Sequence, residues 1–201
     1  LISKNKIKKW RTKDLSIPNI HLDLASHLLS LIIYFFNSLP LLVNSFEVKN
    51  LKKNYIDNAF TWLKFKKFTG QLWFSKNATG KRNELSIQIF GSKGSLKWTH
   101  NNPEEVHLYD NRGNIYIINR LSKKTKYLSN KKLFTYSPGH PSGFLDAFIN
   151  IYNQIYYKYN NQKARVPVLL NLKNNIDIIQ TLNKIHISSI KKKWVSNIIK
   201  K

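Results

Sequence analysis

Residues 22–37, LDLASHLLSLIIYFFN, form a mostly apolar segment around which the rest of the chain is expected to pack. On a helix, a segment this apolar is expected to be surrounded by other protein on nearly every side. Pro18 disfavours helix before it, Asn37 suits a left-handed residue after the last turn, and Pro40 prevents the helix from continuing. The sequence therefore predicts a buried core helix that begins near residues 19–22 and ends near Asn37.

One polar stripe interrupts this helix. Asp23, His27, Ser30 and Tyr34 recur at i, i+4, i+7 and i+11, which places them on one face. A carboxylate one turn from an imidazole favours the imidazolium and can fix its tautomer, so Asp23 and His27 form a candidate proton-transfer pair. The alternative is a solvated polar seam that only caps the helix, and the stripe by itself leaves both interpretations open.

The composition favours a folded protein without cysteine chemistry. The 201 residues are 42% hydrophobic, enough for a core of ordinary size. The absence of cysteine excludes disulfides, thiolate metal sites and cysteine nucleophiles, and it fits a reducing compartment, so we expect a cytoplasmic location. Methionine is also absent, even at position 1, which suggests a fragment or a lost N-terminal part.

The formal net charge of +24 raises the question of a polyanionic partner. Nearly all of this charge is lysine, and lysine, asparagine and isoleucine are frequent along the whole chain. This distribution indicates compositional drift, so we expect no specific nucleic-acid partner, and basic polyanion binding remains an alternative function. No signal peptide or spanning segment is found, so no membrane association is expected.

After the first helix the hydrophobic period changes to two. Strands are predicted at residues 41–50, 55–66, 68–76, 84–90, 95–100, 105–110 and 114–119. Short turns between them predict an antiparallel meander. Helical spacing returns at 143–160 and 172–190, and a short strand is expected within 191–199.

These elements predict an α+β fold, with a large, mostly antiparallel, open-faced β-sheet and helices packed on one face. Aromatic residues occur on both faces of the strands, so the face without helices is expected to meet a partner. Residues 1–20 are predicted to be an extended, basic lead-in, and residues 21–201 one domain.

Several short phrases resemble, in order, the C-terminal domain of the Gfo/Idh/MocA oxidoreductases, the family of glucose–fructose oxidoreductase and inositol dehydrogenase. The phrases are KWRT at 9–12, DLASH at 23–27, RNEL at 82–85, FGSKGSLKW at 90–98, NPE at 102–104, and GHPSGF at 139–144 followed by AFINIY at 147–152. The resemblance runs from about residue 9 to residue 195.

The resemblance implies a site and a cofactor. It implies that His27 is the general acid/base on a sugar or polyol hydroxyl, assisted by Asp23 and by a lysine from an N-terminal Rossmann domain that holds NAD or NADP. It also implies that Trp10 and Arg11 lie near the nicotinamide or substrate, and that His140 lies close to the site, although turn architecture explains the phrase around His140 equally well. A homo-oligomer through the open sheet face is implied as well.

The chain also departs from the family pattern. It contains no Gly-x-Gly-x-x-Gly, so the Rossmann domain is expected to be missing or separate. Ala25, Ser142 and Asn37 replace a glycine, an acidic residue and a glycine of the family pattern. The prediction is the substrate-binding and proton-transfer half of an NAD(P)-dependent oxidoreductase, inactive without its Rossmann domain. The alternative is a non-catalytic remnant or oligomerisation module.

The other histidines show no metal-ligand spacing. They are His21, His100, His107 and His186, and they are expected to be surface or structural residues.

Overall fold

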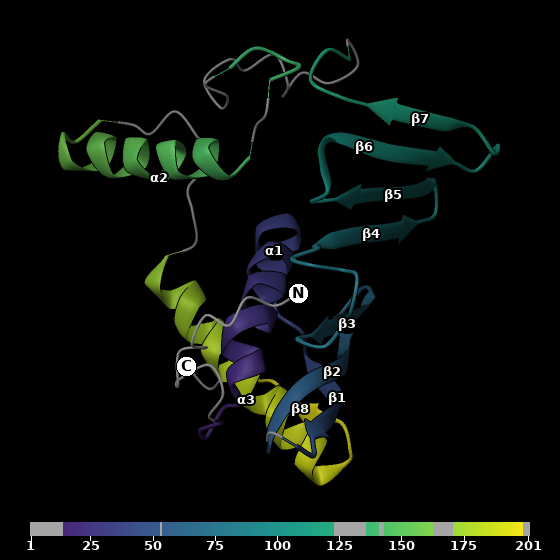
Figure 1. Cartoon of the computed structure of the whole chain (residues 1–201), viewed down its shortest axis with the longest axis vertical. Helices are drawn as coiled ribbons and strands as arrows, with labels where there is room; N and C mark the ends of the chain where they lie inside the picture. The colour runs from purple at the N-terminus through teal and green to yellow at the C-terminus, as the bar shows by residue number, and fades with distance from the viewer. Residues whose placement is uncertain (1–13, 53, 123–135, 141–142, 163–170, 199–201) are drawn as a thin grey trace. The chain divides into compact units, whose positions relative to one another are not determined.

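The computed structural model describes residues 14–52, 54–122, 136–140, 143–162 and 171–198 (Figure 1). The chain divides into two compact units. Unit 1 comprises Leu1–Thr79 and Leu170–Lys201, and unit 2 comprises Gly80–Leu169. Trp10 and Arg11 lie outside the described residues, as does most of the predicted lead-in.

Unit 1 begins with a short π-helical turn that runs directly into an α-helix. Its elements are η2 (His21–Ala25), α1 (Ser26–Phe36), β1 (Leu42–Asn50), β2 (Tyr55–Lys64), β3 (Thr69–Ser75), α3 (Leu172–Lys191) and β8 (Val195–Ser196). The strands form an antiparallel sheet in the order β3-β2-β1-β8. Asn37 follows α1 in the left-handed conformation, with φ 45°, as its sequence position predicts.

The core of unit 1 lies between this sheet and its helices. Leu29 of α1 and Leu182 and Ile185 of α3 are fully buried, and they cluster with inward residues of the strands, including Val43 and Leu63. Each such side chain contributes about 1.5–3 kcal/mol of hydrophobic free energy when it leaves water. The apolar spacing of α1 and α3 therefore holds them on one face of the sheet.

The end of α1 is more exposed than its sequence suggests. Tyr34, Phe35 and Phe36 have exposed fractions of 51%, 52% and 39%. The expectation that protein surrounds this helix on nearly every side is therefore wrong for its last turn.

The opposite face of the sheet carries exposed aromatic side chains. Phe46, Phe60, Trp62 and Trp73 are 66%, 38%, 51% and 50% exposed. The rings of Phe60 and Trp73 stack across β2 and β3, with centroids 6.3 Å apart. This face of unit 1 is open in the described chain.

Strand β1 presents its less apolar side to the core. Val43, Ser45 and Glu47 face inward, whereas Phe46 and Val48 are exposed. Ser45 is accommodated by hydrogen bonds: its N–H donates to Ser188 Oγ at 3.1 Å, and its hydroxyl lies 2.9 Å from Thr61 Oγ1.

Unit 2 is a second antiparallel meander followed by one helix. Its elements are β4 (Ser86–Gly91), β5 (Gly94–Thr99), β6 (Asn102–Asp110), β7 (Ile115–Ile118) and α2 (Phe144–Tyr159), with strand order β4-β5-β6-β7. Among its described residues only Asp146 is buried. Unit 2 therefore has little hydrophobic interior of its own in the described part of the chain.

The predicted α+β class and the antiparallel pairing are confirmed, and the strands form two four-stranded sheets. Each predicted strand and helix corresponds to an observed element, with ends displaced by a few residues. In the described part of the chain, none of the helices has the length and apolar character needed to cross a membrane.

Candidate functional site

Asp23 and His27 lie where the first helix changes from π to α geometry. The Ser26 N–H donates to the carbonyl of His21, five residues back, and the Ser26 hydroxyl donates to the Leu22 carbonyl at 2.7 Å. Single π turns inside helices are frequent at functional sites. This turn holds Asp23 and places His27 just after it, in α1.

Asp23 is paired with a lysine from the same chain. Lys76 Nζ lies 3.1 Å from Asp23 Oδ2, and both side chains are largely buried, with exposed fractions of 19% and 23%. The Lys76 ammonium also donates to Asn19 Oδ1 at 2.5 Å, one turn before Asp23. The lysine therefore neutralises Asp23 and ties it to the start of the helix.

Lys76 is in turn held by the end of the sheet. Its backbone N–H donates to the Asp57 carbonyl at 2.8 Å. The buried Asp57 carboxylate accepts hydrogen bonds from the side chains of Asn50 at 2.6 Å and Asn77 at 3.0 Å. This network fixes the backbone from which Lys76 reaches Asp23.

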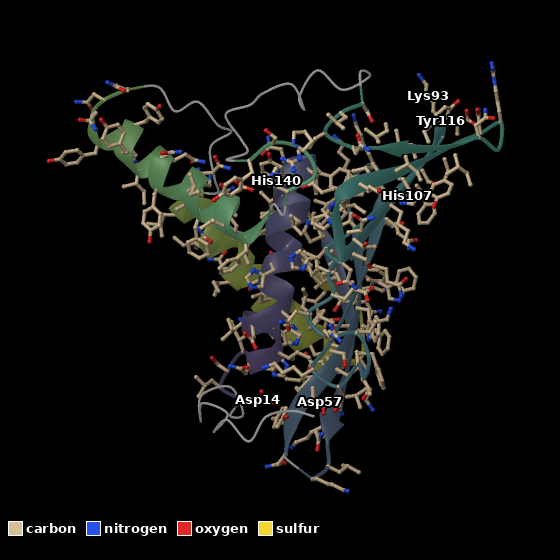
Figure 2. The ribbon with its side chains drawn as sticks, turned by 45° about the horizontal axis from the view of Figure 1, so that its top comes forward. Asp14, Asp57, Lys93, His107, Tyr116 and His140 are labelled. Carbon is tan, nitrogen blue, oxygen red and sulfur yellow. The ribbon has the colours of Figure 1, made fainter. Side chains whose placement is uncertain are left out.

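A second carboxylate, Asp14, attaches the beginning of the helix to β2. It accepts hydrogen bonds from the N–H groups of Asn19 at 3.0 Å and Ile56 at 2.8 Å. Figure 2 shows Asp14 and Asp57 near one another at one end of this unit. Since helix N-termini leave unpaired N–H groups, Asp14 satisfies one of them while fixing the helix against the sheet.

His27 is exposed, and no hydrogen bond or ion pair is recorded for it within the described residues. Asp23 bonds to Lys76 there, and no hydrogen bond between Asp23 and His27 is recorded. The imidazole is thus open to a ligand from solvent, one turn from a carboxylate that is already neutralised. The catalytic roles of both residues stay predictions.

His140, labelled in Figure 2, belongs to unit 2, where Arg120 contacts its segment. The Arg120 side chain lies 2.5 Å from Glu104 Oε2 and donates to the carbonyls of Tyr136 at 3.1 Å and His140 at 3.3 Å. The His140 ring is exposed, with Nδ1 3.3 Å from the Ser137 carbonyl oxygen. Its role in substrate binding also stays a prediction.

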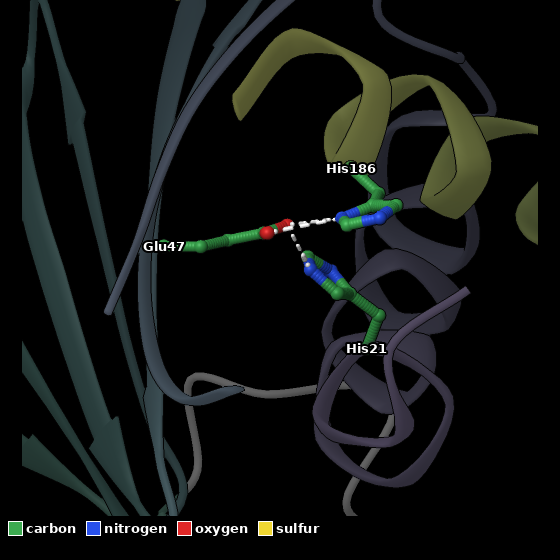
Figure 3. A group of neighbouring side chains, drawn as sticks. All are labelled: His21, Glu47 and His186. Atoms are coloured by element: carbon green, nitrogen blue, oxygen red, sulfur yellow. Dashed lines mark hydrogen bonds and ion pairs between the residues drawn. The ribbon is translucent and has the colours of Figure 1, made fainter. Parts of the chain in front are cut away.

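The structure brings together a group that sequence reasoning missed. His21 and His186 both contact Glu47 inside unit 1 (Figure 3). The expectation for His21 and His186 allowed surface positions, yet His21 is completely buried. Glu47 is separated from the two histidines by 26 and 139 residues, so no local spacing could have indicated the group.

In the described part of the chain, the strands do not show the arrangement of a Rossmann-type dinucleotide site. Such sites use a parallel sheet with a glycine-rich turn before a helix. Every strand pairing in the described ranges is antiparallel, and the full sequence has no Gly-x-Gly-x-x-Gly.

The comparisons with known proteins agree with the fold. A family model described as the C-terminal alpha/beta domain of an oxidoreductase family, Gfo/Idh/MocA, matches residues 3–172. No curated protein sequence matches the chain.

Solved structures resemble the chain at low identity. An oxidoreductase from Pseudomonas syringae aligns with TM-score 0.79 and 15% identity, covering 89% of this chain and 52% of its own. An inositol dehydrogenase homolog from Azotobacter vinelandii, complexed with NADH and myo-inositol, aligns with TM-score 0.79 and 17% identity, covering 94% and 52%. A levoglucosan dehydrogenase complexed with NADH and levoglucosan gives TM-score 0.71 and 16% identity, covering 88% and 50%. The chain thus spans about half the length of these structures.

Proposed function

Because the chain belongs to the Gfo/Idh/MocA oxidoreductases as a C-terminal alpha/beta domain, we propose that it is the substrate-binding and proton-transfer half of an NAD(P)-dependent oxidoreductase. The proposed substrate is a sugar or polyol, oxidised at a hydroxyl. The observation that carries the proposal is the exposed His27 imidazole, one turn after the Asp23–Lys76 pair.

His27 is the proposed general base in the oxidation direction and the general acid in the reverse direction. An imidazole is suited to this because its protonation changes near neutral pH. Its exposure lets it meet a substrate hydroxyl directly, and the hydrogen bonds of Asp14 and Lys76 keep the helix start in place.

Asp23 and Lys76 are proposed to position that helix start. Their ion pair joins η2 to the end of β3, so the backbone that carries His27 is fixed from two sides. Removing Lys76 would leave the largely buried Asp23 carboxylate without its ion-pair partner, so we expect the start of the helix to shift.

The solved relatives support the class of substrate. Two of them are described in complex with myo-inositol and with levoglucosan, each with NADH. When bound, the nicotinamide accepts or donates the hydride, and we propose that a Rossmann domain outside these residues holds it. Trp10, Arg11 and His140 are the proposed substrate-binding residues.

The experiment that tests the proposal combines the chain with the nucleotide-binding domain of its family and follows the reduced nicotinamide by absorbance, with polyols and sugars as substrates. His27→Ala is expected to lower kcat about 10²–10⁴-fold, the usual contribution of a positioned acid/base. Added imidazole should restore part of the rate, because it can take the place of the missing ring as acid or base.

The matched control is His100→Ala, which removes an exposed histidine of unit 2 and should leave kcat unchanged. Full activity of His27→Ala would remove His27 from the mechanism. A loss of activity that imidazole does not restore, together with a lowered melting temperature, would indicate a structural role.

A second candidate function is supported by the open aromatic face of the β3-β2-β1-β8 sheet. An exposed apolar face of this kind commonly marks a protein interface. We propose that it joins copies of the chain into a homo-oligomer, which the chain could do as an oligomerisation module even without catalysis. The exposed Phe46, Trp62 and Trp73 would be its central contacts.

A further inference from the structure

We propose that His21, Glu47 and His186 form a binding site for one divalent transition-metal ion, of which Zn²⁺ is the representative. The three side chains come from η2, β1 and α3, and they converge inside unit 1 (Figure 3). The exposed fractions of their side chains are 0%, 5% and 18%. This site is separate from the proposed catalytic His27 and does not depend on the proposed function.

The donor atoms already face one another. His21 Nε2 lies 2.6 Å from Glu47 Oε1, and His186 Nδ1 lies 3.1 Å and 3.0 Å from the two carboxylate oxygens. The three ligand atoms lie within 4.8 Å of one another. With metal–ligand distances of about 2.0–2.2 Å, the donors of a tetrahedral site are about 3.3–3.6 Å apart. To bind the ion, His21 Nε2 and Glu47 Oε1 therefore need to move apart by about 0.7–1.0 Å, and His186 Nδ1 and the carboxylate by about 0.2–0.6 Å.

The donor set selects the kind of ion. Two imidazole nitrogens and one carboxylate oxygen suit Zn²⁺ and its neighbours, whereas Ca²⁺ and Mg²⁺ prefer oxygen ligands throughout. Three protein ligands leave a fourth position for water. The ion would enter from the side of His186, whose side chain is the most exposed of the three.

Electrostatics also favour a cation here. The Glu47 carboxylate is nearly completely buried, and a buried charge is costly unless it is paired. Without metal, each imidazole nitrogen that faces Glu47 must carry a proton to donate to it. His21 Nδ1 has no hydrogen-bond partner in the described part of the chain. A divalent ion held by both imidazoles would supply the positive charge that pairs with this carboxylate, and it would replace the N–H protons that face it.

The same unpaired nitrogen limits the expected affinity. A metal-bound histidine usually donates its other N–H to a partner, and loss of that partner weakens binding about 10–100-fold. His21 Nδ1 has none in the described residues. We therefore expect a site clearly weaker than a complete structural zinc site. Its role would be to stabilise unit 1, because the ion would join η2 to β1 and α3. Its ligand in η2, His21, lies two residues before Asp23.

The test uses the whole chain, freed of metal with a chelator and without an affinity tag. Zn²⁺ is titrated by calorimetry at physiological ionic strength, because the charge of +24 repels cations at low salt. We expect one ion per chain. Co²⁺ should give the visible absorption bands of a tetrahedral site, and the imidazole NMR signals of His21 and His186 should shift on Zn²⁺ addition.

His186→Ala is the main variant, because this partly exposed histidine is the easiest of the three to remove without unfolding the core. Both His186→Ala and Glu47→Gln should weaken Zn²⁺ binding at least about 100-fold. The matched control is His100→Ala, which should bind as the unchanged chain does. Absence of binding to the unchanged chain would overturn the proposal. So would equal binding by His186→Ala, or Zn²⁺-induced shifts confined to other histidines; the last readout decides even if a variant fails to fold.

Discussion

At the scale of single residues, Asp110 shows how a turn can tune one carboxyl group. Its carboxylate accepts hydrogen bonds from the Asn114 side chain and N–H, both at 2.9 Å, and from the Arg112 N–H at 2.9 Å. The Asn114 side chain is the largest cause of its lowered pKa, followed by the Asn114 backbone, and slight desolvation opposes them. Since the charged form is favoured in the folded state, its stabilising effect is present above the unfolded pKa and lost as pH falls through the folded pKa.

Asn114→Ala should therefore raise the pKa of Asp110 toward its ordinary value, because the side-chain donor is lost while the backbone donors remain. The measurement is an NMR titration of the Asp110 carboxyl carbon. Arg112→Ala is the control: its backbone N–H is the donor, so the pKa should stay low. An unchanged pKa in Asn114→Ala would show that the backbone donors suffice.

Single residues also show where sequence reasoning succeeds. Asn37 was predictable, because a left-handed residue after a helix depends only on its local neighbours. The contacts of Glu47 with His21 and His186, and of Lys76 with Asp23, were not predictable, because they depend on how distant segments fold together.

At the scale of elements, the β4–β5 hairpin depends on one glycine. Gly94 has φ +144°, and a Cβ there would lie 2.2 Å from the Tyr109 carbonyl oxygen of β6. Gly113 also has positive φ, +85°, but apart from its chain neighbours no atom of the described residues lies within 4 Å of the position of its Cβ. An alanine at Gly94 would therefore meet both a backbone clash and backbone strain, whereas an alanine at Gly113 would meet the strain alone.

Gly94→Ala should destabilise unit 2 by about 3 kcal/mol or more, since backbone strain and a backbone clash add. Gly113→Ala should cost only about 1–2 kcal/mol, the strain term alone. Hydrogen exchange of the β5 and β6 amides measures both. Equal losses of unfolding free energy in the two variants would mean that β6 shifts to relieve the clash with little change in stability.

The elements themselves were largely predictable. The change of hydrophobic period from helical spacing to two located strands β1 to β7, because period depends on local geometry. Which face of β1 is buried was not predictable, because the inward Ser45 and Glu47 are satisfied by residues of β2, η2 and α3.

At the scale of the whole molecule, the open face of the β3-β2-β1-β8 sheet predicts self-association. Trp62→Lys places a charge in the centre of that face, so a homo-oligomer should shift to monomer, because an unpaired charge in an interface is costly. Sedimentation velocity measures the change.

The control is Ile190→Lys, at the 67% exposed Ile190 of α3, a helix that packs on the opposite face of the sheet. It should leave the oligomer intact. A chain that is monomeric before any substitution, at high micromolar concentration, would contradict the proposed interface.

The inward polar residues of β1 have a consequence for folding. If β1 slid by one residue against β2, every side chain would change faces, so Phe46 and Val48 would enter the core and Glu47 would reach water. Burial of apolar side chains alone would favour that shifted register, because it would bury Phe46 and Val48. The contacts of Glu47 with two imidazoles, and of Ser45 with neighbouring hydroxyls, oppose this shift because they form only in the observed register. These polar groups therefore specify a single alignment of the strand.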